Sequence, residues 1–133
     1  MNFKNIAILI PGTSNKRNWN NIRESYLYTN FISSLIDCFD NNLRHKIFFG
    51  VDKGDKIYDK ERNKIFLKKY LNEYNIDIEF CSFNIEKGHL SKMWNELFEI
   101  AYDQGYDYFF QCGDDIKFSE KNMFQQFKIG RAH

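Results

Sequence analysis

Two adjacent carboxylates, Asp114 and Asp115, are the residues of this sequence best suited to chemistry. They come directly after Gly113 and follow a run of strand-forming aromatic residues, Tyr108 to Phe110. A buried strand that ends at a glycine and two acids is typical of the open rim of a sheet. Mg²⁺ and Mn²⁺ prefer carboxylate oxygens and usually leave positions open for phosphate oxygens. The pair therefore indicates a divalent metal site, with a solvated Gly-Asp-Asp turn as the alternative.

Other polar residues give weaker indications of binding or catalysis. Lys16 and Arg17 lie in a polar loop where they could clamp a phosphate, and Trp19 in the same loop could stack on a base or pack within the loop. His45 and His89 show no partner at the spacing that zinc or nucleophilic chemistry needs. No residue can be named as a general base, so the catalytic residues stay unknown.

Composition restricts the class of protein. The chain has 133 residues, 43% hydrophobic and 28% charged, which predicts one globular domain spanning residues 1–133. A net charge of +1 argues against broad binding to nucleic acid or to anionic membranes. The three cysteines form no Cys-x-x-Cys pair and are expected to be small buried residues of a reducing compartment. The apolar run Ile6 to Ile10 is too short for a signal peptide or a membrane span, so we expect a cytoplasmic protein.

Strand and helix patterns alternate along the chain. Apolar runs predict strands at 5–10, 46–51, 76–83 and 108–110. The third alternates polar and apolar residues, as an edge strand does. Apolar positions at helical spacing predict helices at 27–39, 59–74 and from about 90 to 104. A short last helix is expected from Ser119, carrying Phe124 and Phe127 and ending at Gly130. The order βαβαβαβ(α) predicts an open, mainly parallel α/β sheet with helices on both faces.

The predicted sheet brings the polar residues together. Right-handed crossovers and an edge position for the third strand give the strand order 3-2-1-4, with the first and fourth strands side by side. The loop after the first strand, Asp52 after the second, and the acid pair after the fourth then share the rim at the carboxyl ends. Ligands of such sheets bind there, where the strand order reverses. The sequence therefore predicts one crevice that collects the polar residues.

The sequence resembles the nucleotide-binding half of a GT-A glycosyltransferase. The resemblance lies in four segments and their order, IAILIPGTS, FFGVD, HLSKMWNELFEIA and YFFQCGDDI, and it extends from about Asn5 to Phe118. It implies that Pro11 and Thr13 border the base of a nucleotide and that Asp52 contacts it, typically as uracil. It also implies that Asp114 faces the ribose and that Asp115, with Asp114, holds Mn²⁺ or Mg²⁺ on the diphosphate. Lys92 and Asn95, near the start of the third helix, would reach the phosphates or the sugar.

The chain departs from that family in two respects. The usual acidic motif is Asp-x-Asp, whereas Gly113 stands at the earlier acid position here. Family members also continue after the motif with a second half that binds the acceptor, and we expect that half to be absent from this chain. A homo-oligomer or another chain would then cover the apolar face that this half leaves.

The leading hypothesis is a glycosyltransferase-like domain that binds a nucleotide-diphosphate sugar, with UDP favoured, and a divalent metal. Its acceptor, a glycan, protein or lipid, is not indicated. One alternative is a non-catalytic nucleotide-sugar-binding module or an inactive, truncated transferase. Another is a metal-dependent nucleotidyltransferase, although the sequence lacks the phosphate-binding signature G-x-x-x-x-G-K-[ST].

Overall fold

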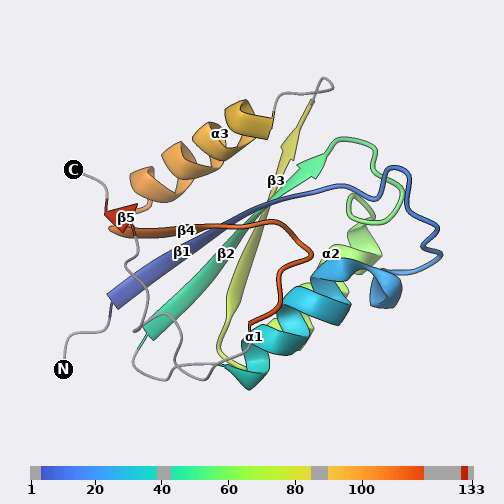
Figure 1. Ribbon diagram of the computed structural model, residues 1–133, viewed down its shortest axis with the longest axis horizontal. Helices are drawn as coiled ribbons and strands as arrows, with labels where there is room; N and C mark the ends of the chain where they lie inside the picture. Colours follow the sequence, from blue (N-terminus) through green and yellow to red (C-terminus); the bar gives the residue numbers. More distant parts are fainter. Residues whose placement is uncertain (1–3, 39–42, 85–89, 119–129, 132–133) are drawn as a thin grey trace.

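The computed structural model describes residues 4–38, 43–84, 90–118 and 130–131. Its core is one sheet in the order β3-β2-β1-β4-β5 (Figure 1). The strands are β1 (Lys4–Gly12), β2 (Leu43–Asp52), β3 (Asp77–Phe83), β4 (Tyr108–Gln111) and β5 (Gly130–Arg131). The first four are parallel, which confirms the predicted order 3-2-1-4.

The two faces of the sheet are covered by different helices (Figure 1). Three consecutive pieces precede β2: the 3₁₀ turn η1 (Ile22–Glu24), the π-helical η2 (Leu27–Ile32) and α1 (Ser33–Asp37). Together with α2 (Glu61–Asn72) they cover one face, and α3 (Leu90–Asp103) covers the other. Helices on both faces are therefore confirmed.

Strand alternation divides the core into two layers. Ile6, Ile8 and Ile10 of β1 face the α1 and α2 side, whereas Ala7 and Leu9 face α3, and all five are fully buried. Successive side chains of a strand point to opposite faces, so a continuous apolar run is needed where both faces are covered. This explains why the predicted first strand has no polar residue between Ile6 and Ile10.

The first predicted helix differs most from the structure. Its first six residues form a π-helical turn, and the α-helical part is only Ser33–Asp37. Ser25 accepts a hydrogen bond from the Tyr28 backbone N–H through Oγ (3.3 Å) and donates to the Ile22 carbonyl (2.6 Å), which ties this element to η1. The predicted end of this helix, at residues 39–42, lies outside the described residues.

The other helix predictions need smaller corrections. The second helix begins at Glu61 and not at Asp59, because the Asp59 carboxylate accepts the Gly54 N–H (2.7 Å) and pairs with Lys64 (2.8 Å) in the turn before it. The short helix expected after Ser119 lies outside the described residues. Gly130, where that helix was expected to end, is the first residue of β5 and pairs antiparallel with Phe109.

Candidate functional site at the carboxyl ends of the parallel strands

Three loops meet beyond the carboxyl ends of the parallel strands. They are residues 13–21 after β1, residues 53–60 after β2, and residues 112–118 after β4. Strand β1 lies between β2 and β4, so the strand order reverses between β1 and β4. Figure 1 shows the loop after β1 and the segment after β4 passing over the side that α1 and α2 cover. Ligands of open α/β sheets bind at such reversals.

Asp55 fastens the loop after β1 to the turn after β2. Its Oδ2 accepts the backbone N–H of Ser14 (2.7 Å), and its Oδ1 accepts the Ser14 hydroxyl (2.7 Å). The same Oδ1 accepts the backbone N–H groups of Ile57 (3.0 Å) and Tyr58 (2.9 Å). Burial by itself would raise the pKa of Asp55, but these hydrogen bonds outweigh it and hold the pKa below its ordinary value. Asp55 is therefore a charged anchor for two loops.

Tyr58 extends this connection to the acid pair. Its ring is 1% exposed, and its hydroxyl donates to Asp114 Oδ2 at 2.8 Å. Burial and the nearby Asp114 charge raise the pKa of Tyr58 well above its ordinary value, so the phenol stays protonated and acts as the donor. Ser14, Asp55, Tyr58 and Asp114 thus form one chain of contacts across all three loops, which we call the rim network.

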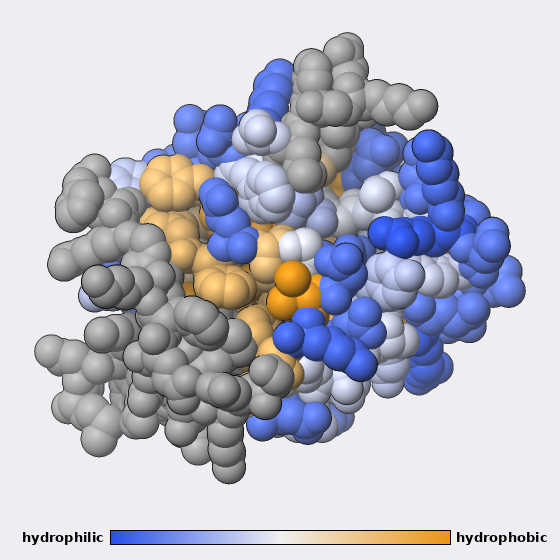
Figure 2. All heavy atoms as spheres, viewed as in Figure 1, coloured by the Kyte–Doolittle hydropathy of each residue, from blue (hydrophilic) through white to orange (hydrophobic). Residues whose placement is uncertain are grey.

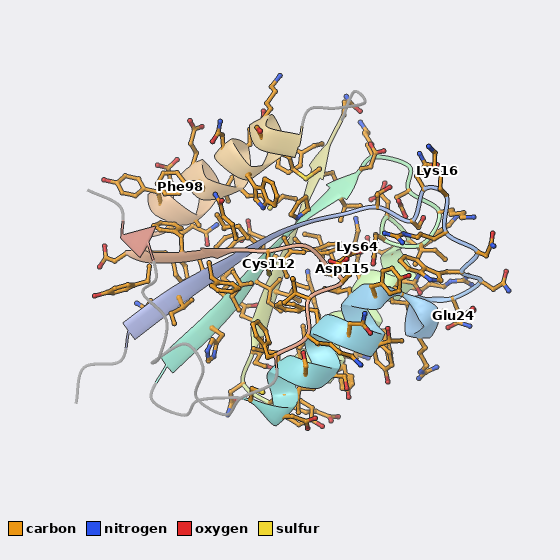
Figure 3. All side chains as sticks on the ribbon, in the orientation of Figure 1. Lys16, Glu24, Lys64, Phe98, Cys112 and Asp115 are labelled. Carbon is orange, nitrogen blue, oxygen red and sulfur yellow. The ribbon has the colours of Figure 1, made fainter. Side chains whose placement is uncertain are left out.

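The two adjacent acids lie in different environments. Asp114 is 8% exposed, and this burial raises its pKa. The hydrogen bond from Tyr58 opposes the rise, whereas the charge of Asp115 adds to it. Asp115 itself is exposed, and Figure 3 shows it at the turn that follows β4. One acid is therefore held inside the protein and the other is open to solvent.

Gly113 leaves room for the Asp115 carboxylate. A Cβ at this position would lie 2.9 Å from Asp115 Oδ1, so a side chain there would push the carboxylate away. Cys112, just before it, is 8% exposed, and burial raises the pKa of its thiol to about 12. The thiol is consequently protonated at neutral pH and is not suited to act as a nucleophile.

The remaining predicted residues lie around this rim or away from it. Pro11 is in β1 opposite Gly50, and the exposed Thr13 accepts the Asn15 N–H through Oγ1 (3.0 Å). Asp52 is the half-buried last residue of β2. Lys92 and Asn95 are exposed on α3, which packs on the opposite face of the sheet from Tyr58. Within the described part of the chain, no hydrogen bond or ion pair joins Lys92 or Asn95 to the acid pair.

Sequence reasoning missed Asp55 and Tyr58. Each is an ordinary residue of a turn after a strand, and its partner is distant in the chain: Ser14 lies 41 residues before Asp55, and Asp114 lies 56 residues after Tyr58. No local pattern marks such pairs. The spacing Asp55-x-x-Tyr58 is the only signal, since an aspartate often accepts backbone N–H groups two and three residues later.

The donor set suits a metal ion that is shared with a phosphate ligand. Among the described residues no group of three His, Cys, Asp or Glu side chains could hold a metal by itself. Mg²⁺ is commonly bound by one or two carboxylates, with phosphate oxygens and water completing its shell. Asp115 offers an exposed carboxylate, and Asp114 has one oxygen that Tyr58 does not engage. Asp115 therefore fits Mg²⁺ or Mn²⁺ of this kind as the main ligand, and Asp114 can add at most one oxygen.

Comparison with known proteins finds no match: no protein-family model fits the sequence, and neither a curated protein nor a solved structure is similar to it. No helix in the described part of the chain is long and apolar enough to cross a membrane.

Proposed function

We propose that this domain binds a nucleotide-diphosphate sugar together with Mg²⁺ or Mn²⁺ and serves glycosyl transfer of the GT-A type, with UDP as the favoured nucleotide. The observation that carries the proposal is the rim network, which holds a buried Asp114 beside an exposed Asp115 at the reversal between β1 and β4. Polar groups that converge from three loops at a reversal of strand order support the proposal of a ligand site there.

Each residue has a distinct role in this proposal. Asp114, fixed by Tyr58, accepts a hydrogen bond from a ribose hydroxyl. Asp115 holds the metal, for which exposure to solvent is suitable. Pro11 and Thr13 border the base and Asp52 contacts it. When bound, the metal supplies Lewis-acid stabilisation of the negative charge that develops on the departing diphosphate.

Binding measurements test the proposal directly. UDP, GDP and their sugar conjugates are titrated calorimetrically with Mn²⁺ and again with a chelator, using wild type and Asp115→Ala. Asp107→Ala is the matched control, because Asp107 is also exposed but precedes β4 at the opposite end of the strand. We expect metal-dependent binding of one nucleoside diphosphate, weakened at least about tenfold by Asp115→Ala and unchanged in the control.

Other results would lead to other conclusions. Failure of the folded wild-type chain to bind any of these nucleotides would refute the donor site. Binding of a nucleotide sugar without hydrolysis or transfer would favour a non-catalytic binding module. A preference for a nucleoside triphosphate over the sugar conjugates would favour a nucleotidyltransferase.

A further inference from the structure

The guanidinium of Arg17 packs on two aromatic rings. Its guanidinium carbon lies 4.6 Å from the centre of the Tyr26 ring and 5.5 Å from the centre of the Trp19 ring. The two rings meet edge to face, with their centres 5.2 Å apart. The backbone N–H of Arg17 also closes a turn onto the Ser14 carbonyl (3.0 Å). Stacking of this kind favours one position of the guanidinium and so lowers the entropic cost of binding a ligand with it.

This guanidinium belongs to the rim that carries the acid pair. The Trp19 ring lies 6.0 Å from the Tyr58 ring, whose hydroxyl contacts Asp114. Arg17, Trp19, Tyr58 and Asp114 thus form a continuous series of contacts from the loop after β1 to the turn after β4. The loop after β1 therefore places a cation beside the turn after β4.

No carboxylate among the described residues pairs with the Arg17 guanidinium. Lys46 and Lys64 pair with acids at 3.0 Å and 2.8 Å. In the part of the chain that the structure describes, the Arg17 guanidinium forms neither an ion pair nor a side-chain hydrogen bond. Within the described residues its N–H donors therefore remain available, and the residue is half-buried against the two rings. An ordered guanidinium with unused donors is suited to bind an oxyanion through two parallel hydrogen bonds.

We infer that Arg17 binds the diphosphate of the nucleotide and makes the site selective for nucleoside diphosphates over monophosphates. This inference rests on the proposed function and adds a phosphate-binding residue to it. Lys16, the neighbouring cation, does not share the role: it is exposed, its backbone is left-handed (φ 63°), and Figure 3 shows it at the outer tip of the loop, away from Asp115.

The test compares UDP with UMP, because the two differ only in the second phosphate. Affinities for both are measured calorimetrically with Mn²⁺ for wild type, Arg17→Gln and Arg17→Lys. The matched control is Arg23→Gln, since Arg23 stacks on the Phe66 ring at 4.7 Å in a similar way but belongs to η1. Thermal unfolding of each variant is recorded at the same time.

We expect Arg17→Gln to weaken UDP binding by about ten- to thirtyfold while UMP binding changes less than about threefold. Arg17→Lys keeps the charge but loses the planar pair of donors, so its affinity for UDP should lie between those of wild type and Arg17→Gln. Arg23→Gln behaves as wild type. If Arg17→Gln does not fold, the ratio of UMP to UDP dissociation constants in Arg17→Lys decides the question.

Three results would overturn the inference. Equal loss of UDP and UMP affinity would show that Arg17 acts only by holding the loop. An unchanged affinity for UDP, with wild type binding normally, would refute the role of Arg17 and leave the proposed function intact. Absence of nucleotide binding in folded wild type would refute both.

Discussion

The hydrogen bond between Tyr58 and Asp114 makes a sharp prediction for the variant Tyr58→Phe. This change removes only the hydroxyl that donates to Asp114 Oδ2 at 2.8 Å and keeps the buried ring. A hydrogen bond to a charged group contributes about 1.5–3 kcal/mol. Because Asp114 is only 8% exposed, water does not readily replace the lost donor. We therefore expect the free energy of unfolding to fall by about 2 kcal/mol at pH 8.

The loss of stability in Tyr58→Phe should increase with pH. Burial raises the pKa of Asp114 in the folded protein above its ordinary value of 3.8, so the folded state binds this proton more tightly than the unfolded chain does. The stability contributed by Asp114 is therefore greatest below pH 3.8 and declines as the pH rises through the folded pKa. Tyr58 restrains that pKa, and its removal raises the pKa further. The cost of Tyr58→Phe is consequently largest at pH 8 and smaller at pH 4.5.

Urea unfolding followed by tryptophan fluorescence measures the free energy of unfolding at pH 8 and at pH 4.5. Tyr26→Phe is the control, because its ring also packs on Trp19 and its hydroxyl has no hydrogen-bond partner within the described residues. The control should lose less than about 0.5 kcal/mol at either pH. An equal loss at pH 4.5 and pH 8 for Tyr58→Phe, or a loss below about 0.5 kcal/mol at pH 8, would refute the reasoning.

Three further substitutions follow from the same geometry. Asp114→Asn should raise the free energy of unfolding at pH 8 by up to about 1 kcal/mol, because it removes a buried charge. Calorimetry of the same variant should show loss of Mn²⁺-dependent UDP binding. A lower free energy of unfolding would contradict the first expectation. Asp55→Ala leaves the donors of Ser14 unpaired and should cost about 2–4 kcal/mol in urea unfolding at pH 7. Since the folded pKa of Asp55 is lowered, its contribution to stability is present above pH 3.8 and is lost as the pH falls through the folded pKa. The cost of Asp55→Ala should therefore shrink as the pH falls below 3.8, and a cost that does not change with pH would argue against the anchoring role. Gly12→Ala should cost about 2–3 kcal/mol, because its Cβ would lie 2.1 Å from Phe49 Cζ, and an unchanged unfolding midpoint would contradict that packing.

The strand order could be predicted from the sequence because the deciding features are local. The uninterrupted apolar run of β1 indicates a strand buried on both faces, and the alternation in β3 indicates an edge. Right-handed crossovers then leave one arrangement. The start of η2 was not predictable in the same way. Leu27, Phe31 and Leu35 follow a helical spacing. Over so few residues this spacing fits a continuous α-helix and also a π-helical turn followed by an α-helix.

The acid pair could be found from sequence, but the residues that support it could not. A glycine followed by two acids after a strand is a local signal. The partners of Asp55 and Tyr58 are set by tertiary contacts between loops that no local pattern connects. Sequence reasoning therefore gave the position of the candidate site but not which acid would be buried. The roles of Pro11, Thr13 and Asp52 remain predictions, as do those of Lys92 and Asn95.

In the proposed site, the two environments would give the adjacent acids different roles. In an extended Asp-x-Asp segment both carboxylates point to the same side of the backbone, so they can share one ion directly. In this turn the neighbours diverge: Asp114 is fixed inside by Tyr58, and Asp115 faces solvent. Figure 2 shows hydrophilic residues over the loops at this end of the sheet, whereas hydrophobic residues gather over the middle of the same face.

A ligand that uses both acids must therefore bridge an inner and an outer position. A ribose diphosphate can do so, because its hydroxyls and its phosphates are separate groups on one molecule. A free metal ion would engage mainly Asp115, since one oxygen of Asp114 is already occupied by Tyr58. Metal binding without nucleotide should consequently be weak, and each should strengthen the binding of the other by the same factor. A coupling factor well above one distinguishes a composite nucleotide–metal site from two carboxylates that only attract cations, for which the factor is close to one.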